Sequence, residues 1–90
     1  MPRYVVQRSF PEGLRIPMGN AGAELRRRVV ERNALEGVTW LSSYVSEDCR
    51  RTFCVYDAPT PEAIRRTAAL NDLPVEAITR VSVLDPYIYE

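Results

Sequence analysis

The order of extended and helical segments constrains the fold of this chain more than any other feature of its sequence. Runs rich in β-branched and aromatic residues predict four strands, and two segments with helix-start signals separate them in the order β-α-β-β-α-β. With a hairpin in the middle, this is the order of the ferredoxin-like fold. Right-handed crossovers place both helices on one face of a four-stranded antiparallel sheet, so we predict one α+β domain over residues 1–90. The predicted strands are Tyr4–Phe10, Val38–Ser46, Arg51–Ala58 and Ile78–Leu84, and the predicted helices are Ala21–Ala34 and Pro61–Leu70.

Local signals predict where each helix begins. Asn20 follows the loop segment Pro17–Gly19 and is predicted to cap the first helix. Thr60 is predicted to cap the second helix, because Pro61 suits the first helical position and Glu62 suits the positive end of the helix dipole. The residues of the second helix expected to pack inward are Ala63, Ile64, Thr67, Ala68 and Leu70.

The length of the hairpin loop decides which side chains of the two central strands share a face. A loop of two residues would pair Tyr44 with Phe53, whereas a loop of three residues would pair Tyr44 with Cys54. We predict the three-residue loop, because it alone gathers the apolar residues of both strands under the helices. That buried set is Leu41, Val45, Phe53 and Val55, joined by Val81 and Val83. The opposite, uncovered face would carry Trp40, Ser42, Tyr44, Thr52, Cys54, Tyr56, Arg80 and Ser82, with Tyr4, Val6 and Arg8 joining if the even residues of the first strand point the same way.

This predicted open face is too apolar to remain bare on a monomer, so we expect a homodimer, a small-molecule pocket, or both. Aromatic side chains on it could stack on a flat ligand while polar ones orient that ligand. The tail Tyr87–Tyr89 also needs a surface to cover, either on a second subunit or on its own. A dimer interface without a ligand is the alternative use of the face. The candidate ligand-binding residues are Tyr4, Arg8, Trp40, Ser42, Tyr44, Cys54 and Tyr56.

The composition excludes several classes of chemistry. The chain has 12 basic residues, all arginine, and no histidine, which excludes Ser-His and Cys-His nucleophile pairs and Schiff-base chemistry on lysine. Its formal net charge of zero gives no bulk attraction to nucleic acid or to an anionic membrane, so neither is an expected partner. The run Arg26–Arg28 is spread around a helix with glutamates at pairing distance, and we interpret it as a solvated face. No secretory signal precedes the first strand, so a cytoplasmic location is expected.

We expect the two cysteines to be reduced thiols that do not hold a structural metal ion. Cys49 is expected to lie exposed in the hairpin turn, and Cys54 in mid-strand is expected to be a small buried hydrophobe. Their positions do not face each other in the hairpin, so we expect no disulfide. No set of Cys, Asp and Glu has convincing ligand spacing, and no metal ligand is predicted within one chain.

Three segments resemble a known family. Gly37–Asp48, Thr52–Pro59 and the early Phe10–Gly13 resemble a family of small actinobacterial proteins of the domain-of-unknown-function class, which includes nickel-binding ferredoxin-like dimers. The resemblance covers almost the whole chain and implies the ferredoxin-like fold and a dimer. Val6 and Arg8 stand where the nickel-binding branch carries acidic and His residues, and a permanent cation opposes a metal ligand. Nickel is therefore implied by the resemblance alone, and no cofactor is predicted.

The leading hypothesis is a small dimeric binding protein whose open sheet face holds a small molecule without catalysing a reaction. A nickel-handling protein like the resembled branch is the second hypothesis. A cofactor-free enzyme of the small dimeric α+β type is the third, with Tyr44, Tyr56 or Cys54 as acid or base, which would require a shifted pKa.

Overall fold

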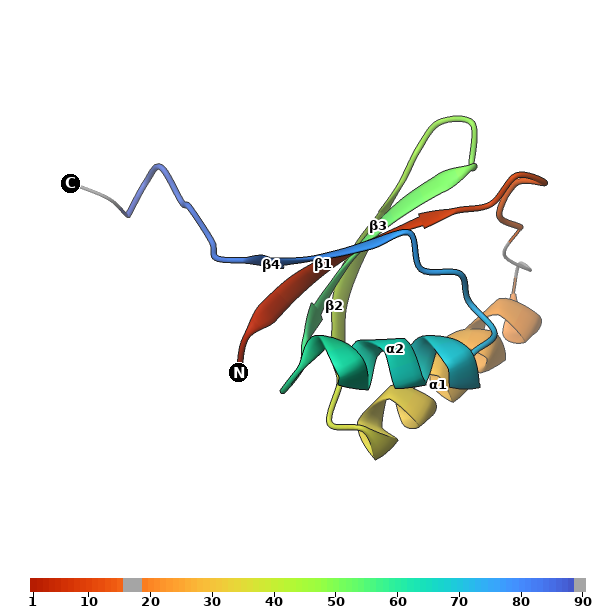
Figure 1. Cartoon of the computed structure of the whole chain (residues 1–90). Helices are drawn as coiled ribbons and strands as arrows, with labels where there is room; N and C mark the ends of the chain where they lie inside the picture. The colour runs from red at the N-terminus through yellow and green to blue at the C-terminus, as the bar shows by residue number, and fades with distance from the viewer. Residues whose placement is uncertain (16–18, 89–90) are drawn as a thin grey trace.

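The computed structural model describes residues 1–15 and 19–88 and confirms the predicted ferredoxin-like architecture. Four antiparallel strands lie in the order β2-β3-β1-β4, and both helices cover one face of the sheet (Figure 1). Pro17 and Met18 of the predicted loop, and Tyr89 of the tail, lie outside the described residues. The elements are β1 (Arg3–Ser9), α1 (Asn20–Leu35), β2 (Thr39–Val45), β3 (Arg51–Asp57), α2 (Pro61–Leu70) and β4 (Ala77–Val81).

The core lies between the two central strands and α2. The even residues of β1 are buried and pair with the even residues of β3, so both strands point the same alternate side chains at the helices. Val6 and Ile64 are the largest fully buried side chains, and burial of each contributes roughly 1.5–3 kcal/mol. The buried cluster consists of Tyr4, Val6, Val38, Cys54, Tyr56, Ala58, Ala63 and Ile64.

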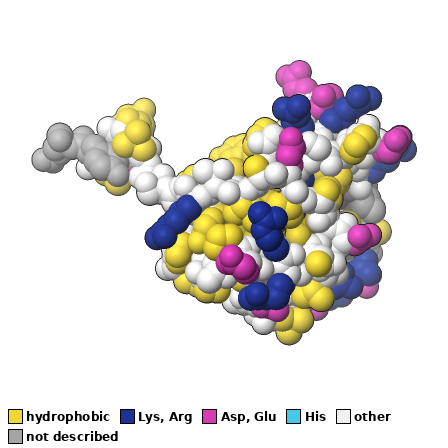
Figure 2. All heavy atoms as spheres, viewed as in Figure 1, with side chains coloured by type: hydrophobic (Ala, Val, Ile, Leu, Met, Phe, Trp, Pro, Cys, Tyr) yellow, Lys and Arg dark blue, Asp and Glu magenta, His cyan; other side chains and the backbone are white. Residues whose placement is uncertain are grey.

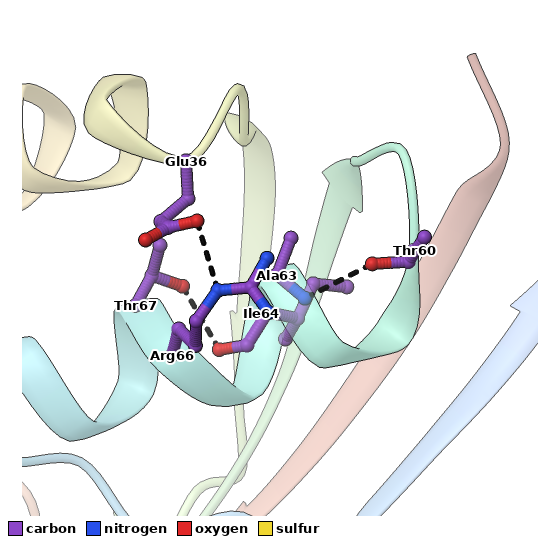
Figure 3. Close-up of polar contacts among 6 residues, drawn as sticks. All are labelled: Glu36, Thr60, Ala63, Ile64, Arg66 and Thr67. Carbon is purple, nitrogen blue, oxygen red and sulfur yellow. Dashed lines mark hydrogen bonds and ion pairs between the residues drawn. The ribbon is translucent and has the colours of Figure 1, made fainter.

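The start of α2 agrees with its sequence signals. The Thr60 hydroxyl accepts a hydrogen bond from the N–H of Ala63 at 3.2 Å, and Pro61 occupies the first turn (Figure 3). Arg66 forms an ion pair with Glu36, next to the last residue of α1, with 2.9 Å between Nε and Oε2 (Figure 3). Four of the five residues predicted to pack inward are buried, but Leu70 at the helix end is exposed.

The predicted cap of α1 is wrong by one residue. Asn20 is the first helical residue, and Gly19 occupies the cap position with a φ of 69°. Such a positive φ favours glycine, whereas a side-chain cap needs an extended backbone, and no side chain caps this helix.

The predicted hairpin register is also wrong. Tyr44 pairs with Phe53 and Val45 pairs with Thr52, and the N–H of Ser46 donates to the carbonyl of Arg51 at 3.0 Å. The turn is therefore the four residues Glu47–Arg50, with Cys49 exposed at a φ of 59°. A bulge lies between Trp40 and Ser42, so the simple alternation along β2 fails there.

These two features reverse the predicted faces for β3 and for Trp40, whereas Ser42 and Tyr44 lie on the open face as predicted. The side chains of Trp40, Cys54 and Tyr56 face the helices, whereas Tyr44, Phe53 and Val55 lie on the open face. The even residues of β1 do share the face of Trp40, but that face is the covered one.

Of the set predicted beneath the helices, Val45 alone shares the face of Thr52 and Cys54. Leu41 is exposed at the bulge, Val81 pairs with Arg3 on the open face, and Val83 is exposed beyond β4.

The C-terminal arm, residues 82–88, leaves the sheet after β4 and projects away from the body (Figure 1). Its apolar side chains are exposed, with Leu84 at 79% and Tyr87 at 94%, and Figure 2 shows hydrophobic side chains on it clear of the rest of the molecule. Among the described residues of the predicted tail, Tyr87 and Ile88 therefore do not pack on their own subunit. Among the residues described, no helix has the length and apolar character needed to cross a membrane.

Candidate ligand-binding cavity

A cavity of about 140 Å³ lies between the sheet and the N-terminal half of α1. The strands contribute its floor, and α1 together with the loops after β1 and α2 contributes its walls. Most of the lining side chains are apolar. From the strands they are Arg8, Trp40, Ser43, Val45, Thr52, Cys54 and Tyr56, and from α1 and the loops they are Phe10, Leu14, Leu25, Arg26, Val29 and Leu73.

The cavity has its origin in the thin apolar stripe of α1. The buried residues of this helix are Gly22 and Asn33, and the larger Leu25 and Val29 lie between them at four-residue spacing. Gly22 brings no side chain to the interface. The helix therefore leaves space over β2 and β3. By contrast, α2 leaves no such space, because its residues Ala63 and Ile64 belong to the core.

Arg8 is the unusual residue of this cavity, because its side chain is a buried cation. The residue is 3% exposed. One terminal nitrogen donates to the carbonyl of Pro74 at 2.8 Å, and the other donates to the hydroxyl of Tyr56 at 3.2 Å. The buried Nε has no hydrogen-bond partner among the described residues. Removing a charge from water without an opposite charge costs several kcal/mol.

The residues beside Arg8 bring no negative charge to it. Burial raises the pKa of Tyr56, although the nearby guanidinium opposes this rise, so the phenol stays protonated at neutral pH. The Cys54 thiol donates to the Thr52 hydroxyl at 3.8 Å. Within residues 1–15 and 19–88, the ion pairs join Arg3 to Asp57 and Arg66 to Glu36, and neither includes Arg8.

Trp40 supplies an aromatic wall with a fixed orientation. Its indole N–H donates to the Ser43 hydroxyl at 2.8 Å across the bulge. Regular alternation would place Trp40 and Ser43 on opposite faces of the sheet, but because of the bulge both line the cavity. The indole is partly buried against the core and also lines the cavity.

The structure brings together four of the seven predicted site residues. Arg8, Trp40, Cys54 and Tyr56 line the cavity. Tyr4 lies on the same face but belongs to the core cluster. Ser42 and Tyr44 lie on the open face, because the bulge and the four-residue turn place Ser43 and Val45 on the helix side instead. Tyr44 is therefore separated from Tyr56 and Cys54, the other candidate acid–base groups.

Sequence reasoning missed the part of the cavity that lies outside the strands. Phe10 and Leu14 come from the loop after β1, and Leu25 and Val29 come from α1. The four-residue spacing of Leu25 and Val29 is the signal that could have placed both on the inward side of this helix. No signal in the sequence indicated that the sheet face beneath them carries Arg8.

A comparison with known families and structures agrees with this fold. A family model described as "Nickel responsive protein SCO4226-like" matches residues 4–81. The crystal structure of SCO4226 from Streptomyces coelicolor A3(2) is similar with a TM-score of 0.73 at 12% identity, over 92% of this chain and 99% of that chain. No curated protein matches this chain significantly. The structural likeness supports the fold, and the family match covers most of the chain, so this chain belongs to the nickel responsive SCO4226-like family.

Proposed function

We propose that this protein binds a small, largely apolar molecule in the cavity between the sheet and α1. The observation that carries the proposal is a cavity of about 140 Å³ with predominantly apolar walls and one aromatic side chain, Trp40. A cavity of about 150 Å³ in another protein binds benzene, so a ligand with one six-membered ring matches this space. Apolar pockets with a few polar groups are typical of small-molecule sites.

A matched pair of α1 variants tests this proposal. Val29 lines the cavity, whereas its neighbour Val30 is exposed. We expect Val29→Phe to fill part of the cavity and abolish binding of benzamide, a neutral one-ring probe. Val30→Phe makes the same change on the outer surface and should leave binding intact. Trp40 is the one tryptophan of the chain, so its fluorescence reports binding directly, and amide NMR spectra verify that each variant is folded.

Two results would overturn the proposal. One is a folded wild-type protein whose Trp40 fluorescence and amide spectrum respond neither to benzamide nor to its charged counterpart benzoate. The other is equal binding by wild type and Val29→Phe, which would place the ligand elsewhere.

Nickel, the metal named by the family description, does not fit the residues that line this cavity. Ni²⁺ is held by imidazole, thiolate and carboxylate ligands. The chain has no histidine, and the described residues contain no group of three or more Cys, Asp or Glu that could hold a metal ion. Cys54 shares the cavity with the guanidinium of Arg8, whose charge repels a second cation.

We also propose that a second copy of this chain covers the open sheet face. Tyr44 is exposed there beside partly buried Phe53 and Val55. The C-terminal arm carries further exposed apolar side chains away from the body (Figure 2). Two copies related by a twofold axis would let each arm contact the other subunit, which is the self-complementary contact that such symmetry requires.

A further inference from the structure

We propose that the cavity selects an anionic ligand, a small aromatic or similarly compact monocarboxylate whose carboxylate pairs with the guanidinium of Arg8. This inference rests on the proposed function and adds the chemical class of the ligand. It starts from the burial of Arg8 in the floor of the cavity and from its Nε, which has no partner in the described part of the chain.

The existing partners of Arg8 hold the guanidinium in place without neutralising it. Pro74 accepts through a backbone carbonyl, and Tyr56 accepts through a protonated hydroxyl. Both are neutral dipoles. The Cζ atom of Arg8 lies 6.0 Å from the centre of the Tyr56 ring, at the outer limit of a cation–π contact. The guanidinium is thus oriented in advance, and an incoming anion would not have to order it.

The charges around the cavity favour an anion over a cation or a neutral polar group. The charged residues that line it, among those described, are Arg8 and Arg26, and both are positive. Arg26 is exposed at the α1 side of the cavity. A carboxylate can accept from Nε–H and an adjacent terminal N–H side by side, the paired geometry that arginine favours.

The size and walls of the cavity limit the rest of the ligand. A volume of about 140 Å³ accommodates roughly one ring and its carboxylate, and excludes large conjugated acids. Trp40, Leu25 and Val29 offer apolar contact to the ring. Inorganic anions would satisfy the charge of Arg8 but leave these walls without contact.

The test compares benzoate with benzamide, which has the same ring and a similar shape but no charge. Both are titrated into the full chain at neutral pH, in a buffer free of carboxylate and phosphate, with Trp40 fluorescence and calorimetry as readouts. We expect benzoate to bind about tenfold or more tightly than benzamide, since a charged hydrogen-bonded pair is stronger than a neutral one. Equal affinities would overturn the inference while leaving the proposed function in place. Absence of binding by both probes would overturn the proposed function as well.

Two arginine variants assign the charge. Arg8→Met should remove the preference for benzoate and keep the binding of benzamide. Arg28→Met removes the same charge from an exposed position of α1 that does not line the cavity, and it should preserve the preference. If Arg8→Met is folded and still prefers benzoate, Arg8 is not the anion site. If Arg8→Met does not fold, Arg8→Lys replaces it in the test, because lysine keeps the charge but lacks the planar guanidinium. Arg8→Lys should bind benzoate more weakly than wild type. Unchanged binding by Arg8→Lys would contradict the paired geometry.

Discussion

At the scale of single residues, two arginines of β1 show how differently one side chain behaves in two environments. Arg3 lies on the open face and pairs with Asp57, with 3.0 Å between Nε and Oδ1. Arg8, five residues later, lies on the covered face with neutral partners. The alternation of a strand places them on opposite sides of the sheet, so residue type alone does not predict whether an arginine is neutralised.

The Arg3–Asp57 pair predicts a pH dependence of stability. The hydrogen bond from Arg3 lowers the pKa of Asp57 below its ordinary value. A carboxyl with a lowered pKa in the folded state stabilises the fold above its unfolded pKa of about 3.9, and this contribution is lost as the pH falls through the folded pKa. We expect Asp57→Asn to be less stable than wild type at neutral pH, with the difference shrinking in acid. Urea denaturation at a series of pH values measures it.

The control for this experiment is Asp72→Asn, which removes the same charge from the turn after α2. The pKa of Asp48 is also lowered, mainly by the hydroxyl of Ser46, but Asp48 is present in both proteins and cancels in the comparison. A stability difference between wild type and Asp57→Asn that stays constant through the acid range would contradict the role given to Arg3.

At the scale of elements, the contrast between the two helices explains which features were predictable. The start of α2 is encoded locally, because Thr60, Pro61 and Glu62 act on backbone groups within one turn. The register of β2 is not local. The apolar pattern could not specify how β2 pairs with β3, because both faces of β3 carry apolar side chains, Phe53 on one and Tyr56 on the other. The pattern also indicates neither the bulge at Leu41 nor the four-residue turn. The structure places Arg8, Trp40, Cys54 and Tyr56 on one face of the sheet, but that face is the one the helices cover and not the predicted open face.

The cap of α2 gives a prediction at this scale. Thr60→Ala removes the acceptor for the N–H of Ala63 and should lower the free energy of unfolding by about 1 kcal/mol. Thr60→Ser keeps a hydroxyl and should retain most of the stability. Chemical denaturation of the three proteins measures the effect. Equal loss in Thr60→Ser and Thr60→Ala would show that the methyl group of Thr60, rather than its hydroxyl, stabilises the helix start.

At the scale of the whole molecule, the C-terminal arm accounts for the elongated shape. The principal extents are 44 × 31 × 25 Å, and the arm points along the long direction in Figure 1. The exposed arm and the uncovered sheet face leave large apolar side chains such as Leu84 and Tyr44 in contact with solvent. Both surfaces are consistent with the proposed second copy.

Truncation after Ser82 tests the proposed dimer. We expect the full chain to sediment as a dimer and the truncated chain to shift toward monomer, because each arm would no longer contact its partner. Tyr44→Arg, a change on the open face, should produce the same shift. Leu35→Ser replaces an exposed apolar residue at the end of α1 and should not. A full chain that sediments as a monomer over the whole concentration range would contradict the proposal.

The choice of arginine at position 8 has a consequence for how the cavity responds to acidity. A histidine in its place would gain and lose a proton within the physiological range, and would make occupancy depend on the surroundings of the protein. A guanidinium keeps its proton throughout that range. In the proposed complex, a change of affinity with pH would therefore report the titration of the ligand's own carboxylate.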